Sequence, residues 1–182
     1  MDYWSDISLV QRAKQSDPGA FQELIERHYP MVYALAYKYS GLQTDAEDIS
    51  QEVFIRVARG IRGFREAASF TTWLYRITLN AAAEFCARRS KHSDGHTAFD
   101  ELQDLHTHAA TPEQTALALQ LLKTIDRLPA KLKEAALLVL CEGFSHKEAA
   151  MALGCAETTV SWRIFKARKQ LKRMLREEGI DE

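Results

Sequence analysis

The fold is decided by residues 145–177, SHKEAAMALGCAETTVSWRIFKARKQLKRMLRE. Ser145 and Glu148 have the spacing of a capping box, in which a hydroxyl and a carboxylate satisfy free amides at the start of a helix. Gly154 can supply the positive φ of a tight turn, because glycine has no Cβ to clash there. The stretch therefore predicts a helix-turn-helix, with a short helix before Gly154 and a longer one after it.

The longer helix has two different sides. One side follows helical spacing, is apolar and is expected to face the core: Val160, Ile164, Ala167, Leu171 and Leu175. The other sides carry basic residues and, between positions 160 and 176, no acidic one. Such a helix can lie in the major groove of DNA with phosphates on either side. Its first turns would then meet base edges, and the candidates are Glu157, Thr158, Thr159, Ser161, Trp162, Arg163, Lys166 and Arg168.

The segment before this motif is also predicted to be helical. Thr111 and Pro112 suit the cap and the first turn of a helix, and Pro129 interrupts that helix. A second helix is expected over 130–141, with Gly143 ending it. The expected core side of the first of these helices is Leu117, Leu121, Leu122, Ile125 and Leu128.

The first half of the chain predicts a separate helical unit. A helix is expected over 17–39, with Pro30 kinking or dividing it. Thr44 and Glu47 have capping-box spacing, and the helix that they open is expected to bury Ala46, Ile49, Val53, Val57 and Ile61. Its opposite side would expose Asp45, Asp48, Glu52, Arg56 and Arg59.

A loop over 60–68 and one more helix complete this unit. The helix is expected to start at Ser69 or Thr71 and to end near Arg88 and Arg89.

Composition supports a helical protein throughout. The 182 residues are 46% hydrophobic and 27% charged, which is enough apolar material for cores and too much for disorder. Helix formers dominate, and no stretch alternates as a strand does. No run approaches the roughly 18 apolar residues of a membrane span, and the start lacks the pattern of a signal peptide. Three cysteines without C-x-x-C spacing predict neither a disulfide framework nor a zinc site, and favour a reducing cytoplasm.

These patterns together predict an all-α protein with two small helical domains, over 1–90 and 113–182. The segment between them, 91–112, is polar, acidic and rich in histidine, which is typical of a flexible linker. Flexible histidines rarely hold the geometry of a metal site, so neither a metal nor a cofactor is predicted. The net charge of −1 hides a segregation of acidic and basic stretches, which indicates separate surfaces for separate partners.

Two stretches resemble the extracytoplasmic-function (ECF) sigma factors of bacterial RNA polymerase, which belong to the sigma-70 family. Three segments resemble region 2 of these sigma factors: DAEDISQEVFIRV (45–57), Phe64-Arg65 and FTTWLYRITLN (70–80). Four segments resemble region 4 of these sigma factors: Leu128-Pro129, GFSHKEAA (143–150), Thr159-Val160 and RIFKAR (163–168). Both signatures occur in the family's order around a linker of suitable length. The resemblance implies an alternative sigma factor that binds core RNA polymerase, recognises promoters and is not an enzyme.

The resemblance implies a docking site for the β′ clamp helices of the polymerase, at Asp45, Asp48, Gln51 and Glu52. An acidic patch itself requires a basic partner, which DNA cannot be. The helix dipole alone would explain Asp45 and Asp48, but not Glu52, which lies two turns further in.

The resemblance also implies that residues 64–73 melt and read the −10 element. Aromatic surfaces can replace lost base stacking, at about 1–3 kcal/mol per base. The aromatic candidates are Phe64, Phe70, Trp73 and Tyr75, although Trp73 also has the spacing of a core residue. Arg65, Arg76 and Asn80 are candidates for contacts with phosphates or base edges of the DNA. Arg88 and Arg89 are candidates for contacts with its backbone phosphates.

The helix after Gly154 is implied to read the −35 element. This chain has Ser161 and Trp162 where the family commonly has a basic residue and then serine, and Ala156 and Thr158 replace serine and glycine. The base-by-base −35 preference therefore does not follow from the family's pattern.

Further partners follow from the same resemblance. It implies contact with the β flap of the polymerase and inhibition by an anti-sigma factor. It also implies that the linker carboxylates Asp100, Glu101 and Asp104 thread toward the polymerase interior.

The residues leave other classes of function open. The basic helix could be solvated without a ligand, or could belong to a repressor or activator that binds operators alone as a dimer. A metal hydrolase would use the carboxylates of 45–52 with histidines, but its usual motifs H-E-x-x-H and G-x-S-x-G do not occur.

Overall fold

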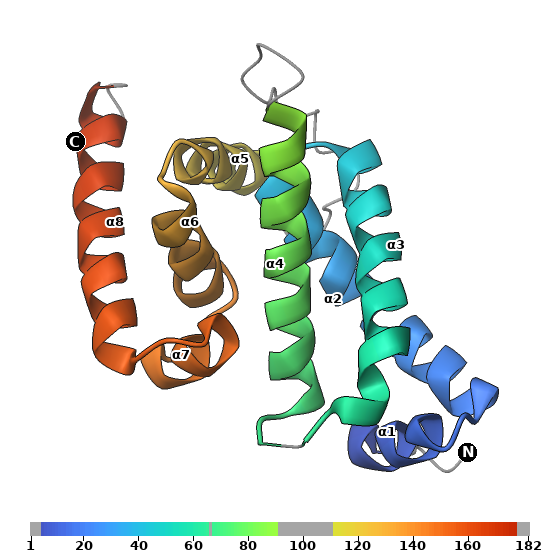
Figure 1. Cartoon of the computed structure of the whole chain (residues 1–182). Helices are drawn as coiled ribbons and strands as arrows, with labels where there is room; N and C mark the ends of the chain where they lie inside the picture. Colours follow the sequence, from blue (N-terminus) through green and yellow to red (C-terminus); the bar gives the residue numbers. More distant parts are fainter. Residues whose placement is uncertain (1–4, 66, 91–110, 178–182) are drawn as a thin grey trace. The chain divides into compact units, whose positions relative to one another are not determined.

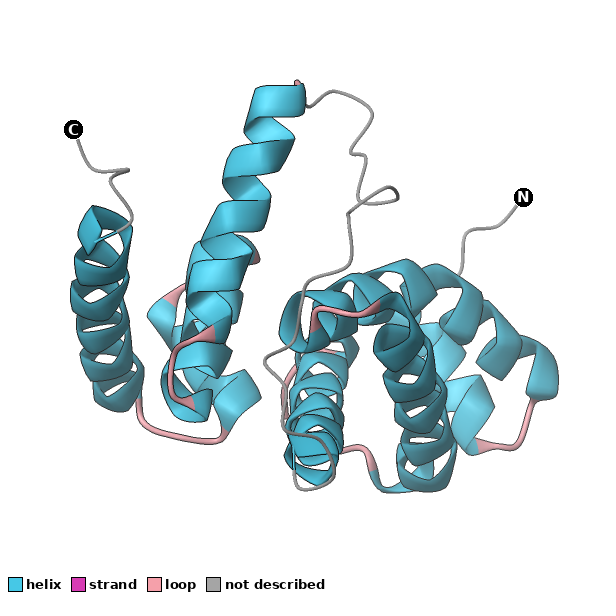
Figure 2. Ribbon diagram, turned by 90° about the horizontal axis from the view of Figure 1, so that it is seen from above, coloured by secondary structure: helices cyan, strands magenta, loops and turns pink. Residues whose placement is uncertain are grey.

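The computed structural model describes residues 5–65, 67–90 and 111–177 (Figure 1). The chain divides into two compact units, residues 1–95 and 96–182. Every regular element of the described residues is a helix, which confirms the all-α prediction (Figure 2). Most of the predicted linker, residues 91–110, lies outside the described residues.

Unit 1 is a bundle of four α-helices: α1 (Asp6–Lys14), α2 (Pro18–Ser40), α3 (Gln43–Gly60) and α4 (Phe70–Ser90). A 3₁₀ turn (Ile61–Gly63) follows α3. Figure 1 shows α3 and α4 side by side, and α2 packs against both of them and against α1. The fully buried side chains of unit 1 include Leu9, Leu24, Leu35, Ile49, Leu74 and Leu79. Helix α1 was not predicted from the sequence.

The starts of these helices have local causes. Ser5 caps α1, and Asp17 caps α2 just before Pro18, which suits a first turn because its missing N–H has no partner to lose there. Ser69 Oγ accepts a bond of 3.0 Å from the Thr72 N–H, which confirms the predicted start of the last helix of the unit.

Two predictions about unit 1 need correction. Helix α2 is not divided at Pro30 and runs as one element, with the proline on its exposed side and buried residues before and after it. Helix α3 begins at Gln43 without a side-chain cap, so Thr44 and Glu47 form no capping box. The turn at Gly41, with a φ of 79°, instead leads directly into the helix.

Unit 2 contains α5 (Pro112–Asp126), α6 (Ala130–Ala136), α7 (His146–Leu153) and α8 (Glu157–Glu177). A π-helical turn (Leu137–Cys141) extends α6, so the predicted helix over 130–141 is confirmed. Helix α8 packs against α5, α6 and α7. The core includes Ile125, Leu137, Leu138, Ala149 and Ile164.

Three residues predicted for the core of unit 2 are not buried, and one of them, Leu121 on α5, is half-buried. Leu117 is 62% exposed, because the described residues in the first half of α5 are all exposed or half-buried and the core begins near Leu122. On α8 the last buried position is Met174, with Leu175 half-buried. The spacing of the α-helix explains this, since Met174 continues the stripe of Ala167 and Leu171.

Candidate DNA-binding and protein-docking surfaces

The helix-turn-helix is built by α7, a turn at Gly154 and α8. The Ser145 N–H donates to Glu148 Oε2 at 2.9 Å, and the Glu148 N–H donates to Ser145 Oγ at 3.2 Å. The bond from the Ser145 hydroxyl, followed by that from the Ser145 backbone, lowers the pKa of Glu148 below its ordinary value. Gly154 has a φ of 63°, which turns the chain sharply into α8. The predicted motif is therefore confirmed.

Two aromatic side chains lie on the outward side of α8. Trp162 and Phe165 are 57% and 64% exposed. Lys166 Nζ lies 5.7 Å from the centre of the Trp162 ring, a cation–π contact that orients the lysine along the helix. Large aromatic side chains this exposed usually mark a surface that another molecule covers.

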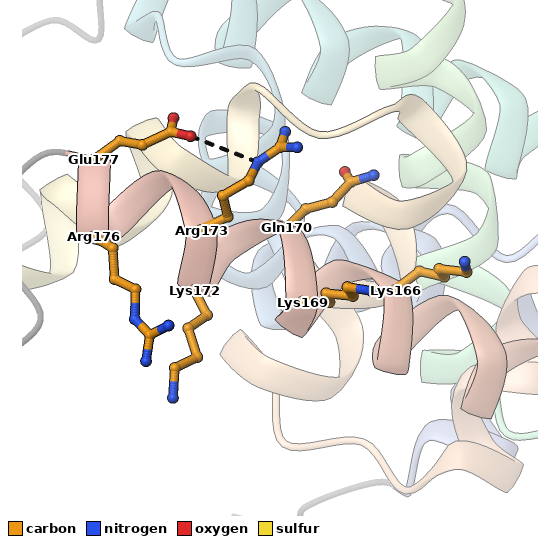
Figure 3. Close-up of a pocket in the computed structure, with 7 residues that line it drawn as sticks. All are labelled: Lys166, Lys169, Gln170, Lys172, Arg173, Arg176 and Glu177. Atoms are coloured by element: carbon orange, nitrogen blue, oxygen red, sulfur yellow. Dashed lines mark ion pairs between the residues drawn. The ribbon is translucent and has the colours of Figure 1, made fainter.

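Basic side chains continue this surface along α8. Figure 3 shows Lys172 and Arg176 extending from the same side of the helix. Arg173 extends from another side and pairs with Glu177 at 3.8 Å. The outward side of α8 therefore combines aromatic surface near its start with cations along its length, a pattern suited to a DNA groove.

The eight residues predicted to meet base edges are not equally available. Thr159, Arg163 and Lys166 are half-buried, and the exposed ones are Glu157, Thr158, Ser161, Trp162 and Arg168. Ser161 Oγ donates to the Glu157 carbonyl at 3.1 Å and shares a hydrogen bond of 2.8 Å with His146 Nδ1. Arg163 Nη1 lies 3.8 Å from Cys155 Sγ. Ser161 therefore links α8 to α7 through His146, while Trp162 is 57% exposed.

The predicted set of base-reading residues omitted Phe165. It lies about one helical turn after Trp162 and two turns after Thr158, so helical spacing places all three on one side. That signal was present in the sequence.

The acidic side of α3 is partly engaged within unit 1. Asp48 and Gln51 are exposed. Glu52 Oε1 accepts from Arg56 Nε at 2.8 Å, and Arg56 Nη2 also donates to Glu84 on α4 at 2.7 Å. These bonds raise the pKa of Arg56, chiefly through Glu84, and the Arg56 bond lowers the pKa of Glu84.

The expected exposure of Asp45 is wrong. Asp45 is buried, and its carboxylate accepts from Arg89 near the end of α4. Helix α3 starts earlier than predicted and packs beside α4, which turns Asp45 toward that helix. Arg89, predicted for DNA phosphates, is the residue that pairs with it.

An aromatic cluster packs where α4 begins. Phe64 lies 6.0 Å from Phe70 and 5.0 Å from Trp73, measured between ring centres. The Phe70 ring also lies 5.3 Å from the His28 ring. Phe64 and Phe70 are buried and Trp73 is half-buried. The cluster therefore holds the loop to the bundle, and the spacing that indicated a core role for Trp73 agrees with this packing.

Tyr75, the fourth aromatic candidate, is only 6% exposed. It is buried in unit 1, as Phe64 and Phe70 are, and its role in binding a base stays a prediction. The polar candidates differ: Arg65, Arg76, Asn80 and Arg88 are all exposed.

A pocket of about 250 Å³ opens beside the aromatic cluster. Helix α1 forms one wall, and the loop with the start of α4 forms the other. The lining residues are Asp6, Ile7, Val10, Phe64, Ala68, Ser69, Phe70 and Thr71. The pocket is smaller than the roughly 300–1,000 Å³ of sites for drug-sized ligands, so its size suits a single ring system.

Among the residues that the structure describes, no group of three histidine, cysteine or acidic side chains could hold a metal ion. The linker histidines lie outside that part of the chain. Within it, no helix is long and apolar enough to cross a membrane.

Two family models match the chain, one in each unit. Residues 24–92 match sigma-70 region 2, and residues 118–171 match sigma-70 region 4. Among curated proteins, the chain is 36% identical over 178 residues to the ECF RNA polymerase sigma-E factor of Haemophilus influenzae, covering 92% of this chain and 94% of that protein.

Solved structures show the same architecture. CnrH, solved in complex with the cytosolic domain of CnrY, has a TM-score of 0.68 at 25% identity, covering 93% of this chain and 96% of CnrH. The sigma factor RpoE from Bartonella quintana, solved with the anti-sigma factor NepR, has a TM-score of 0.67 at 24% identity, covering 86% and 96%. The latter likeness shows the fold alone.

These matches set aside a repressor that acts by itself and a metal hydrolase. The chain belongs to the ECF type of the sigma-70 family and is an alternative sigma factor, a non-enzymatic protein of transcription initiation.

Proposed function

We propose that unit 1 docks on core RNA polymerase and holds the melted −10 element, while unit 2 reads the −35 element with α8. The observation that carries this proposal is the separation of charge between the two units. Exposed acidic side chains lie on α3, whereas the outward side of α8 is basic and aromatic. One surface requires a cationic protein partner and the other an anionic one.

The docking surface on α3 is formed by Asp48, Gln51 and Glu52, and its partner is the β′ clamp helices. Glu52 is already paired with Arg56, so the polymerase must share or replace that ion pair. Asp48 and Gln51 are exposed and need no such exchange. Asp45 acts indirectly, by fixing α3 against α4.

The pocket beside the aromatic cluster takes one base of the melted −10 element. A base removed from its stack needs an apolar surface, which Phe64 and Phe70 supply from the pocket wall. Arg65, Arg76, Asn80 and Arg88 are exposed and suit the phosphates and base edges around it.

Helix α8 reads the −35 duplex through its outward side. Thr158 and Trp162 lie near its start and face base edges, with Phe165 beside them. The cations further along, including Lys172 and Arg176, contact phosphates. Because Trp162 presents a large apolar surface, we expect contacts with thymine methyl groups to contribute to the −35 preference.

The regulation follows that of the related proteins. The RpoE of Bartonella quintana was solved with an anti-sigma factor, and we propose that this chain is held inactive by such a partner and released to bind the polymerase and its β flap. We place this activity in the cytoplasm, where Cys86, Cys141 and Cys155 stay as reduced thiols.

Transcription with purified components tests the proposal. Core RNA polymerase and this chain are incubated with a genomic promoter library, and the 5′ ends of the transcripts are sequenced. We expect start sites preceded by a shared pair of −35 and −10 elements. Start sites without a shared −35 element would overturn the role of α8, and an absence of initiation would overturn the docking of unit 1.

A further inference from the structure

We propose that Asp6 makes the pocket beside the −10 loop select adenine or cytosine, through the amino group at N6 or N4, over thymine, which carries the acceptor O4 at the corresponding position. This inference rests on the proposed function of the pocket as a base-binding site. It assigns a role in promoter specificity to α1, which lies outside the residues that match the region 2 family model.

The position of Asp6 is the first reason. Asp6, Ile7 and Val10 of α1 line the pocket together with Phe64 and Phe70. Ile7 and Val10 are apolar, so Asp6 places a carboxylate against an otherwise hydrophobic wall. A base in this pocket would therefore have one carboxylate-bearing residue and two aromatic residues among its neighbours.

Two bonds within unit 1 hold the carboxylate in place. Asp6 Oδ1 accepts from Arg27 Nη1 at 2.7 Å, and Asp6 Oδ2 lies 2.9 Å from His28 Nε2. Arg27 is held in turn by Glu23 at 2.7 Å, and the bond to Asp6 is the main cause of its raised pKa. His28 packs against Phe70, so one network connects the carboxylate to the aromatic side of the pocket.

The carboxylate still has capacity for a ligand. Each oxygen of an ionised carboxylate offers two acceptor sites, and the bonds to Arg27 and His28 use one on each oxygen. The side chain is 28% exposed, so the remaining sites can be reached. An ionised carboxylate accepts hydrogen bonds and cannot donate one.

This chemistry distinguishes the bases. Adenine carries a donor at N6 and cytosine a donor at N4, and acidic side chains are known acceptors for the cytosine amino group. Thymine presents O4, an acceptor that the carboxylate repels. A binding site built around a hydrogen bond strongly rejects a ligand that lacks the donor or acceptor group, because the polar atom of the site is then left unpaired.

The test uses the full chain bound to core polymerase, with labelled single-stranded DNA of the non-template −10 strand. Each position of the element is first replaced by an abasic site. The position whose loss weakens binding most identifies the base in the pocket. If no abasic position weakens binding, the proposed base site itself is wrong.

The second step removes only the amino group at that position. Adenine is replaced by purine, or cytosine by 2-pyrimidinone, and thymine is compared in parallel. We expect the native complex to bind the amino-bearing base about ten-fold more tightly than its deaminated analogue, the loss of one bond to a charged group. Equal binding of the base and its analogue would overturn the inference without touching the base site, and no variant protein is needed for that outcome.

The third step assigns the effect to Asp6. Asp6→Asn should remove the difference between the base and its analogue, and should weaken the rejection of thymine because its amide can donate to O4. Glu23→Gln is the matched control, since it removes another acidic partner of Arg27 and Glu23 is not among the residues that line the pocket. We expect this control to keep the native preference. An unchanged preference in Asp6→Asn would exclude Asp6 as the selecting residue.

Discussion

Arg89, in the last turn of α4, donates to the carboxylate of Asp45, in the first turn of α3. The two residues are 44 positions apart in the sequence, and their side chains are 27% and 11% exposed. Sequence reasoning placed them on two different binding surfaces. The ion pair instead joins the ends of two helices that carry the proposed docking surface and the proposed −10 surface.

The pair should contribute to the stability of unit 1. Asp45→Asn is expected to lower the free energy of unfolding by about 1.5–3 kcal/mol, since it removes a partly buried bond between charged groups. Asp48→Asn, on the exposed side of the same helix, should change it by less than about 0.5 kcal/mol. Denaturant unfolding followed by circular dichroism measures both. Equal stability of the two variants would show that the pair is not structural.

Polymerase docking should depend on Asp48. Asp48→Lys is expected to weaken binding to core polymerase, because it places a cation opposite a basic surface. Glu26→Lys, on the exposed side of α2, makes the same charge change elsewhere in unit 1 and should leave binding unchanged. Fluorescence anisotropy with labelled chain measures both affinities, and the defect should shrink at high salt. A similar loss in both variants would point to net charge instead of a docking site.

Substitutions at two positions of α8 should weaken the binding of −35 DNA in different ways. Trp162→Ala is expected to change the ranking of −35 sequences, with a loss of about 1–3 kcal/mol at the favoured base. Lys172→Ala should weaken binding to all sequences alike and reduce the slope of log affinity against log salt by about 1. Binding of a −35 duplex library at several salt concentrations separates the two. An unchanged ranking in Trp162→Ala would remove that residue from base recognition.

Acidic pH should lower the stability of unit 2, because Glu148 of its capping box becomes protonated. Because the folded pKa of Glu148 lies below its ordinary value of 4.5, the stability that it contributes is present above that value and is lost as the pH falls through the folded pKa. Ser145→Ala removes the main cause of the lowered pKa. The variant should therefore lose less stability than the native chain as the pH falls below 4.5. Parallel losses, measured by thermal unfolding between pH 5 and 3, would contradict this account.

The local patterns of the helix-turn-helix were read correctly from the sequence, whereas the capping box predicted at Thr44 and Glu47 was not. The capping box at Ser145, the positive φ at Gly154 and the stripe from Val160 to Leu171 depend on residues within a few positions of one another. Their physical causes are a hydrogen bond to the nearest backbone, a missing Cβ and the spacing of a helix. For this reason the helix-turn-helix could be predicted together with one side of its second helix.

Predictions failed where a residue's environment comes from distant parts of the chain. Asp45 looks exposed from helical spacing, and only the packing of α3 on α4 shows that it faces Arg89. Leu117 has core spacing, yet its half of α5 is exposed or half-buried among the described residues.

The sequence was therefore sufficient for the helices other than α1, for the two units and for the family, since these follow from short-range spacing and two local signatures. The pocket beside the −10 loop could not be predicted from the sequence. Asp6 comes together with Phe64 and Phe70 only because α1 packs beside the turn that follows α3. Side chains that contribute to one surface from distant positions leave no regular spacing in the sequence, so the folded chain alone shows which of them meet.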